Sequence, residues 1–343
     1  MKKILAVLPV VSGAVGGGLY HQARETVAAL STSEYSVEPY NPWKQYDWES
    51  ISAVHIFCAN RETYDMALFV RSRNIPLVVS PVFFSLHPAW LIQAELLGTR
   101  LIQKISSGVV SSFFFLKEIC RMADAILPNT DEEARLIAKI CAISHERIRI
   151  VPNGVSPHFS HATPELFQQK YGMIEPILSV GNIGYVRKNM LNLLKAVAPL
   201  SHPVYIIGPI YHNAYGKACQ EIAQNAPHIN LLGPLDNSDP LLASAYAAAR
   251  VFALPSALET PGIASLEAAS TGATIVTTPY GGTRYYFGEG AYYCNPRSIR
   301  SIRTAIEQAL RSPKASMADT ILSRFTWEQV GRETAALYGD LLG

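Results

Sequence analysis

Two glutamates, Glu259 and Glu267, are the residues whose type and spacing most directly suggest chemistry. Seven residues separate them, in a stretch where the apolar run Val251–Leu254 ends and Pro261 and Gly262 introduce a helix. Proline suits the first turn of a helix, and the N–H groups at a helix start are available to an anion. A diphosphate docked there would lie between two carboxylates, and each carboxylate can accept hydrogen bonds from neighbouring sugar or ribose hydroxyls.

A basic turn supplies the cations that such a diphosphate would need. The strand candidate Ile177–Val180 is followed by Gly181 and Asn182 and then by Arg187 and Lys188. A positive charge at this point would neutralise a departing diphosphate. Lys188 is the first candidate and Arg187 the second. The alternative is a solvated basic pair at the start of a helix.

The composition limits the classes of protein that can present these groups. Of the 343 residues, 49% are hydrophobic and 16% are charged, and the formal net charge is +2, so we expect a globular protein without a dedicated nucleic-acid surface. Five scattered cysteines, with no C-x-x-C pair, disfavour a metal cluster or a disulfide framework and favour a reducing compartment, the cytoplasm. Lys3–Leu8 is interpreted as a buried strand, with a short signal peptide as the alternative.

Short apolar runs alternate with helix-length segments, which predicts α/β domains with doubly wound parallel sheets. The turn-forming stretch Pro152–Pro157 predicts the boundary between two such domains, and the last segment, through Leu342, reads as a helix that returns to the first domain. Ligands of these sheets bind beyond the carboxyl ends of the strands, so we expect chemistry in a cleft between the domains. Thr130–Glu133 reads as a capping box. The expected strands are Lys3–Leu8, Ser36–Glu38, Ala53–Phe57, Leu77–Ser80, Ala125–Leu127 and Arg147–Val151, and then Ile177–Val180, Val204–Ile207, Ile229–Leu232, Val251–Leu254, Thr274–Thr277 and Ala291–Tyr293.

With these flanks, the glutamate pair resembles the E-x7-E element of retaining GT-B glycosyltransferases, particularly glycosyltransferase family 4 (glycosyl transferases group 1). Further matches follow in the family's order from Gly16 to Tyr338. They are the glycine loop Gly16–Gly18, the stretch from Ala123 to Thr130, the Pro152-Asn153-Gly154 turn, the donor-domain strand ending at Gly181, the Pro255-Ser256 pair, and Gly281-Gly282.

The resemblance implies a GT-B fold of two doubly wound Rossmann-like domains. Residues 1–156 with 327–343 would bind the acceptor, and residues 157–326 would bind a nucleotide-sugar donor, with UDP- or GDP-sugars favoured. It also implies retention of anomeric configuration, no metal and no cofactor, and a glycan, lipid-linked or protein acceptor in surface glycan or glycoconjugate synthesis. The implied catalytic residues are Glu259, Lys188, Arg187 and His87, and the implied donor-binding residues are Gly17, Gly18, Gly181, Asn182, Gly262, Ile263 and Glu267.

Three departures from the family pattern bear on this interpretation. Asn182 stands where many members have an arginine, and Pro81 stands where many have a histidine, with His87 as a substitute six residues on. Thr260 and Pro261 replace the usual glycine and phenylalanine. Two alternatives therefore stay open, a non-catalytic GT-B partner or scaffold subunit and a nucleotide-sugar 2-epimerase.

The segment 90–121 has two interpretations. It contains two amphipathic, helix-length stretches with basic residues and the cluster Phe113-Phe114-Phe115. A helix pair packed on the first sheet is favoured, because acidic residues nearly cancel the basic ones. Peripheral contact with anionic lipid at the inner face of the membrane is the alternative. No apolar run approaches the roughly 18 residues of a membrane span.

Overall fold

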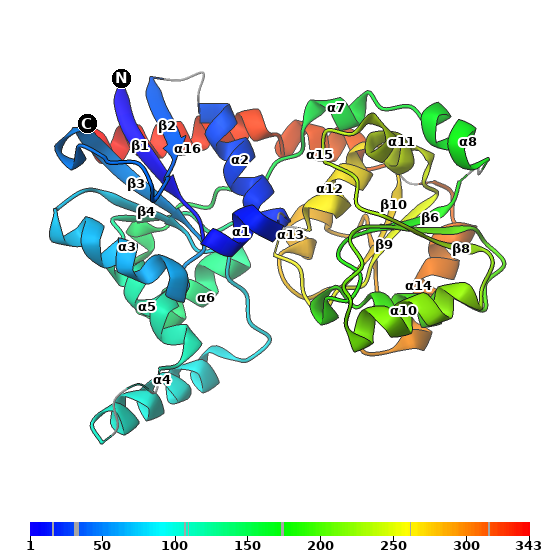
Figure 1. Cartoon of the computed structure of the whole chain (residues 1–343), viewed down its shortest axis with the longest axis horizontal. Helices are drawn as coiled ribbons and strands as arrows, with labels where there is room; N and C mark the ends of the chain where they lie inside the picture. Colours follow the sequence, from blue (N-terminus) through cyan, green and yellow to red (C-terminus); the bar gives the residue numbers. More distant parts are fainter. Residues whose placement is uncertain are drawn as a thin grey trace. The chain divides into compact units, whose positions relative to one another are not determined.

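The computed structural model describes residues 1–15, 17–30, 34–105, 108, 110–172, 175–260, 262–314 and 316–343. The chain divides into two compact units, an N-terminal unit of residues 1–153 with 327–343 and a C-terminal unit of residues 154–326. The expected boundary was residue 156. Each unit is built around one parallel sheet (Figure 1).

The N-terminal unit has a five-stranded sheet in the order β2-β1-β3-β4-β5, with every neighbouring pair parallel. Its strands are β1 (Lys2–Val7), β2 (Tyr35–Pro39), β3 (Ile51–Phe57), β4 (Leu77–Ser80) and β5 (Ala125–Ile126). Its helices are α1 (Val10–Val15), α2 (Gly18–Leu30), α3 (Arg61–Ser72), α4 (Ala89–Gln103), α5 (Ser112–Met122), α6 (Asp131–Cys141) and α16 (Trp327–Leu342).

Helices cover both faces of this sheet because successive side chains of each strand point to opposite faces. Val54 and Ile56 belong to a core shared with residues of α3, α5 and α6. On the other face, Phe57 packs with Ala23 of α2, and His55 contacts Tyr338 of α16. His55 is buried and hydrogen-bonds through Nδ1 to the Tyr338 hydroxyl at 2.7 Å and through Nε2 to the Ser80 hydroxyl at 2.9 Å. This polar chain ties the C-terminal helix to the sheet.

The C-terminal unit has a six-stranded parallel sheet in the order β11-β10-β9-β6-β7-β8. Its strands are β6 (Ile177–Val180), β7 (Val204–Ile207), β8 (Ile229–Leu232), β9 (Val251–Leu254), β10 (Thr274–Thr277) and β11 (Tyr292–Tyr293). Its helices are α7 (Pro157–Ser160), α8 (Glu165–Tyr171), α9 (Met190–Val197), α10 (Ala214–Gln224), α11 (Pro240–Ala248), α12 (Ile263–Ser270), α13 (Thr283–Phe287), α14 (Ile299–Arg311) and α15 (Ala318–Arg324). One continuous apolar core joins the sheet to helices on both faces.

The structure corrects three local predictions. Arg147–Val151 is not a strand: residues 145–147 form a 3₁₀ turn, and Ile148 makes only an isolated bridge to Ile126. The neighbouring chain reaches Pro128 there, and proline has no N–H with which to extend the ladder. Helix α1 occupies part of the stretch expected to be a turn before the glycines. The capping box is half formed, since Thr130 caps the N–H of Glu133 while the Glu133 carboxylate accepts from Phe83 and Asn129 instead.

Candidate functional site

An ion pair between Lys188 and Glu259 is the central feature of the C-terminal unit's candidate site. Lys188 Nζ lies 2.7 Å from Glu259 Oε1, and the Glu259 side chain is only 4% exposed. The Ser256 hydroxyl donates to the same oxygen at 2.6 Å. A buried carboxylate is tolerated only when it is paired and hydrogen-bonded, and these two groups meet that requirement. The structure thus brings together the first two predicted catalytic residues, which lie far apart in the sequence.

Glu259 is held in its ionised form. Burial acts to raise the pKa of its carboxyl, but the positive charges of Lys188 and Arg187 and the hydrogen bonds from Lys188 and Ser256 outweigh burial. The pKa of Glu259 therefore lies below its ordinary value. At neutral pH this side chain is an acceptor of hydrogen bonds and a negative charge, not a proton donor.

The backbone around Glu259 is fixed by the glycine pair that follows β10. The N–H of Glu259 donates to the carbonyl of Tyr280 at 3.1 Å, and the N–H of Gly282 donates back to the carbonyl of Glu259 at 2.8 Å. Gly281 between them has φ +96°, and a Cβ on it would lie 1.9 Å from the Glu259 carbonyl oxygen. Only glycine fits this position, which explains its presence in the sequence.

Arg187 lies on the same turn as Lys188 but faces a backbone group. Its guanidinium donates to the carbonyl of Leu258 at 3.3 Å, and its own carbonyl accepts from the N–H of Ala257 at 2.8 Å. The turn at 186–188 is thereby tied to the loop that carries Glu259. Arg187 contributes positive charge to the site and also holds the two loops together.

Gly181 and Asn182 lie at the carboxyl end of β6. A Cβ on Gly181 would meet Met190 Cε at 3.1 Å and Lys188 Cδ at 3.7 Å, so glycine leaves the space through which the lysine chain passes. Asn182 directs its amide to the Tyr211 hydroxyl at 3.4 Å. Gly181 therefore borders the Lys188 turn, whereas Asn182 contacts Tyr211.

Gly262 and Ile263 form the start of α12. Gly262 is the N-cap with left-handed φ of +64°, and its carbonyl accepts from the N–H groups of Ser265 and Leu266. A Cβ on Gly262 would approach the Glu259 side chain at 3.6 Å, so the helix start and the ion pair are neighbours. The sequence placed Pro261 in the first turn; Pro261 lies outside the described residues, and the helix begins at Ile263.

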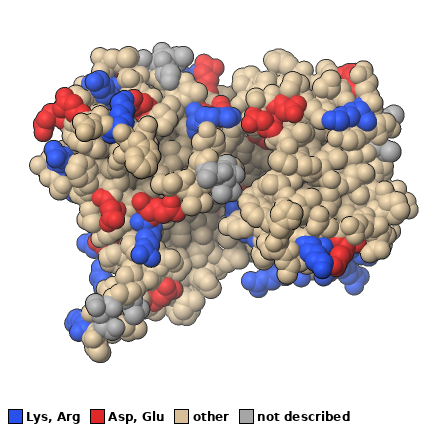
Figure 2. Space-filling view, viewed as in Figure 1, with Lys and Arg blue, Asp and Glu red and all other residues tan. Residues whose placement is uncertain are grey.

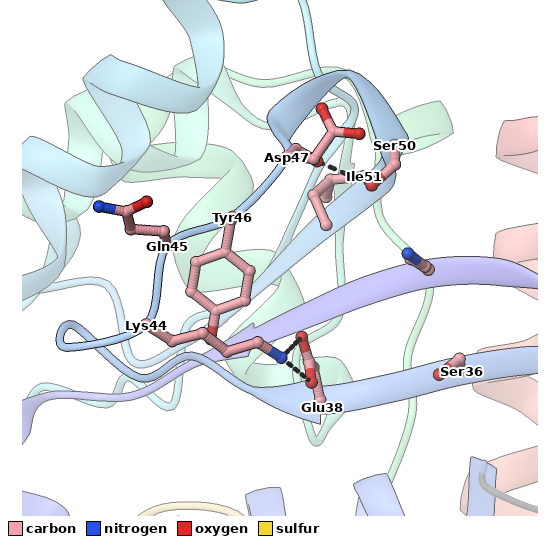
Figure 3. A pocket seen from close by; sticks show the side chains of 9 residues that line it. Ser36, Glu38, Lys44, Gln45, Tyr46, Asp47, Ser50 and Ile51 are labelled. Atoms are coloured by element: carbon pink, nitrogen blue, oxygen red, sulfur yellow. Dashed lines mark hydrogen bonds and ion pairs between the residues drawn. The ribbon is translucent and has the colours of Figure 1, made fainter.

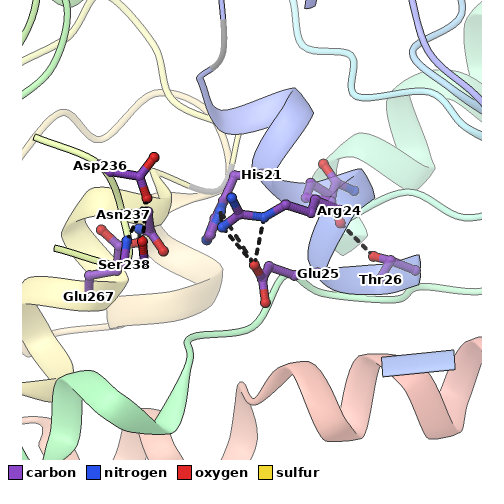
Figure 4. Close-up of polar contacts among 9 residues, drawn as sticks. His21, Arg24, Glu25, Thr26, Asp236, Asn237, Ser238 and Glu267 are labelled. Carbon is purple, nitrogen blue, oxygen red and sulfur yellow. Dashed lines mark hydrogen bonds and ion pairs between the residues drawn. The ribbon is translucent and has the colours of Figure 1, made fainter. Parts of the chain in front are cut away.

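Glu267 is buried within α12 and is bonded at both oxygens. Asn237 Nδ2 donates to Oε1 at 2.6 Å (Figure 4). The Tyr246 hydroxyl donates to Oε2 at 2.8 Å. Burial, and then the adjacent Glu267 charge, raises the pKa of Tyr246 well above its ordinary value, so this hydroxyl keeps its proton. Sequence reasoning missed both partners. Asn237 could have been suspected from its place in the polar loop that follows β8, whereas nothing in the sequence pointed to Tyr246.

The other predicted site residues belong to the N-terminal unit. Gly17 has φ +97° and precedes α2, whose first residue is Gly18; Gly16 lies outside the described residues. His87 is exposed on the loop between β4 and α4, where it lines a small surface pocket with Leu91, Ile92 and Glu95. The structure therefore shows His87 as a loop residue of its own unit.

A second surface pocket of the N-terminal unit, drawn in Figure 3, is lined by polar and charged side chains. Lys44 and Glu38 pair within it at 2.8 Å and 2.9 Å. Lys3 and Ile51 contribute to it from the starts of β1 and β3, not from the carboxyl ends where such sheets bind ligands. Among the residues that the structure describes, no group of three metal-ligating side chains occurs.

The match to a known protein family lies in the C-terminal unit. A family model described as "Glycosyl transferases group 1" matches residues 175–312. A D-inositol 3-phosphate glycosyltransferase of Corynebacterium urealyticum is 27% identical over 250 residues, which cover 66% of this chain and 58% of the relative. An MMP alpha-(1->4)-mannosyltransferase of Mycolicibacterium hassiacum is 24% identical over 242 residues, covering 65% of this chain and 55% of the relative. The matched region thus spans little more than half the length of these relatives.

Solved structures show the fold over the whole chain. Sucrose-phosphate synthase from Thermosynechococcus elongatus superposes with a TM-score of 0.77 at 17% identity and covers 99% of both chains. Anabaena HepE, solved with UDP and glucose, superposes with a TM-score of 0.71 at 15% identity and covers 99% of this chain and 100% of its own. The chain therefore has the GT-B fold, and residues 175–312 are similar to the glycosyl transferases group 1 family.

Proposed function

We propose that this protein is a retaining glycosyltransferase that moves a sugar from a nucleotide-sugar donor to a hydroxyl acceptor, in the synthesis of a surface glycan or glycoconjugate. The observation that carries the proposal is the buried Lys188–Glu259 pair beside the glycine-capped start of α12. A cation, a helix start and an ionised carboxylate at one point are the groups that a sugar diphosphate needs. The relation to HepE, which binds UDP and glucose, supports a nucleotide donor.

In the proposed reaction, Lys188 stabilises the charge of the departing diphosphate. Glu259 accepts hydrogen bonds from hydroxyls of the transferred sugar, while Glu267 accepts from ribose hydroxyls and the amides of Gly262 and Ile263 face the phosphates. The bond between the anomeric carbon and the phosphate oxygen breaks, and the bond to the acceptor oxygen forms on the same face. The acceptor proton passes to the leaving phosphate oxygen.

We propose that the positive charge of the residues present allows a metal-independent mechanism. Lys188, Arg187 and the start of α12 all contribute positive potential near Glu259. We propose that this arrangement takes the place of a divalent cation and that the protein needs no cofactor. UDP- and GDP-sugars are the favoured donors, and addition of a chelator should leave turnover unchanged.

The test is slow hydrolysis of a panel of UDP- and GDP-sugars by the purified protein and by Glu259→Ala. We expect turnover of one donor and a loss of at least about 100-fold in the variant, because an electrostatic contact in the transition state is removed. Calorimetry with UDP and GDP measures nucleotide binding independently of the reaction. If no nucleotide or nucleotide sugar binds, the enzyme assignment fails and a scaffold subunit becomes the better description. Release of nucleotide with a 2-epimerised sugar would assign a 2-epimerase instead.

We further propose that α4 contacts an anionic membrane surface on which an acceptor could be carried. Ile92 and Leu96 are buried on one side of this helix, but its other side is also apolar. Helix α4 extends away from the sheet of its own unit (Figure 1). Arg100 and Lys104 are exposed on the same segment and would meet anionic headgroups. The exposed apolar side chains are Trp90 (65%), Leu97 (61%), Leu101 (55%) and Ile105 (91%).

Flotation with phosphatidylglycerol vesicles at low salt tests this contact. We expect the protein to float with anionic vesicles but not with phosphatidylcholine vesicles, and Leu101→Asp to reduce flotation severalfold because a charge enters the apolar face. Leu166→Asp is the matched control, since Leu166 is a leucine 48% exposed on α8. No flotation of the wild type, or equal loss in both variants, would contradict the proposal. In the described part of the chain, no helix is long and apolar enough to cross a membrane.

We propose a cytoplasmic location for the protein. All five cysteines are free thiols, and four of them are buried. Burial raises the pKa of Cys58 to about 11 and of Cys294 to about 12, which keeps these thiols protonated and unreactive. Figure 2 shows acidic and basic side chains interspersed, in keeping with the net charge of +2.

A further inference from the structure

Asn189 occupies a strained position directly after Lys188. Its φ is +58°, in the left-handed region that most residues avoid, and its side chain is largely buried. The side-chain amide donates to two backbone carbonyls, that of Pro255 at 2.8 Å and that of Pro296 at 2.7 Å. Asn192 Nδ2 in turn donates to Asn189 Oδ1 at 2.9 Å. Both amide hydrogens and the amide oxygen are therefore used.

These bonds join the lysine turn to the segment that carries its partner. Pro255 directly follows β9 and precedes Ser256, whose hydroxyl bonds the Glu259 carboxylate. Pro296 lies in the loop after β11. One side chain thus fixes the backbone next to Lys188 against two separate loops. Glycine would adopt the same left-handed backbone more readily, but it could not make either bond.

We infer that Asn189 is a positioning residue that sets the location of the Lys188 ammonium group for the leaving diphosphate. The inference rests on the proposed function and deepens it by adding a residue that touches no substrate. A shift of about 1 Å in a charged group that acts in the transition state can lower a rate about 100-fold. Without the Asn189 amide, the turn that carries Lys188 loses its bonds to the carbonyls of Pro255 and Pro296. We therefore expect a shift of this size in the Lys188 ammonium group.

Asn189→Gly is the primary test, because it retains the left-handed backbone and removes only the amide. We expect kcat for donor hydrolysis to fall about 10- to 100-fold while the donor KM changes less than about threefold. Asn189→Asp is the second variant; it keeps the shape but places a carboxylate oxygen against two carbonyls, so its loss of kcat should be larger. Asn74→Gly is the matched control, since Asn74 is an exposed asparagine with φ +55° in the N-terminal unit.

A cycle with Lys188→Met shows whether Asn189 acts through the lysine. We expect Asn189→Gly to lower kcat little further once Lys188 is absent, and additive losses would overturn the inference. Equal kcat in Asn189→Gly and the wild type would also overturn it.

The same set of variants can also be compared by thermal unfolding, and this measurement does not depend on activity. The summed Tm losses of the two single variants should exceed the loss in the double variant, because both act on one ion pair. If no donor is turned over, the proposed function fails, and the Tm cycle still decides whether Asn189 holds Lys188. Additive Tm losses would show that it does not.

Discussion

Removal of the Lys188 ammonium group should destabilise the C-terminal unit through the carboxylate that it leaves behind. In Lys188→Met, Glu259 stays 4% exposed but loses the partner at 2.7 Å. Breaking a buried pair from one side costs about 3–5 kcal/mol, and we take about 3 kcal/mol because the Lys188 side chain is itself 20% exposed. For a unit of this size, about 3 kcal/mol corresponds to a Tm decrease of about 6–12 °C.

The effect should depend on pH in a defined direction. In the wild type, the pKa of Glu259 lies below its ordinary value of 4.5, so its contribution to stability is present above that value and is lost as pH falls through the lower pKa. Without Lys188, burial becomes dominant and the pKa of Glu259 rises. The variant then gains a proton at mildly acidic pH, which removes the unpaired charge. The difference in stability between wild type and variant should therefore be largest near pH 8 and should shrink towards pH 5.

Thermal unfolding followed by circular dichroism at pH 5 and pH 8 measures this difference. Lys195→Met is the matched control, because Lys195 is an exposed lysine on the neighbouring helix α9. A Tm decrease at pH 8 no greater than that of the control would refute the reasoning. A decrease that grows as the pH falls would refute it as well, since the unpaired carboxylate would then not be the cause.

Three further changes have directions set by the structure. Gly281→Ala should cost about 2–5 kcal/mol, because its Cβ would collide with the Glu259 carbonyl at a positive φ, whereas Gly233→Ala has open space and should change Tm little. Burial lowers the pKa of His55 to about 3, so the contribution of His55 to stability is lost as pH falls from about 6.5, and in acid titrations His55→Gln should be less sensitive to pH over this range than the wild type. Burial, opposed by hydrogen bonds from Phe83 and Asn129, raises the pKa of Glu133 to about 7. The contribution of Glu133 to stability is therefore lost as pH rises from about 4.5 to 7, opposite in sign to that of His55, and urea unfolding at a series of pH values should show this contribution as the difference between the wild type and Glu133→Gln.

The strands of the C-terminal unit were predictable from the sequence almost to the residue. Ile177–Val180, Val204–Ile207 and Thr274–Thr277 have the predicted bounds, because a parallel strand covered on both faces is mostly apolar and so stands out in the sequence. The same reasoning predicted a strand at Arg147–Val151, and this prediction was wrong. It has a strand-like composition, but whether it pairs depends on the N–H groups of the chain beside it, where Pro128 offers none.

The residue types at the candidate site were also readable, since a glutamate pair around a helix start and a lysine after a strand are local patterns. The sequence could not predict which hydrogen-bond donor each acceptor oxygen of the site would have. Tyr246 pairs with Glu267 and Asn189 with Pro255 and Pro296 across long stretches of chain. Such partners are chosen by the strand order β11-β10-β9-β6-β7-β8, which brings the ends of β6, β9 and β10 to one edge.

The sequence by itself therefore determined the elements and the chemical groups, because burial and turn formation act on neighbouring residues. Only the tertiary structure decided that Lys188 pairs with Glu259 and that the Asn189 amide ties the turn bearing Lys188 to two loops. The physical reason is that a hydrogen bond requires its two atoms to lie within about 3 Å of each other, and separation along the chain says nothing of that distance.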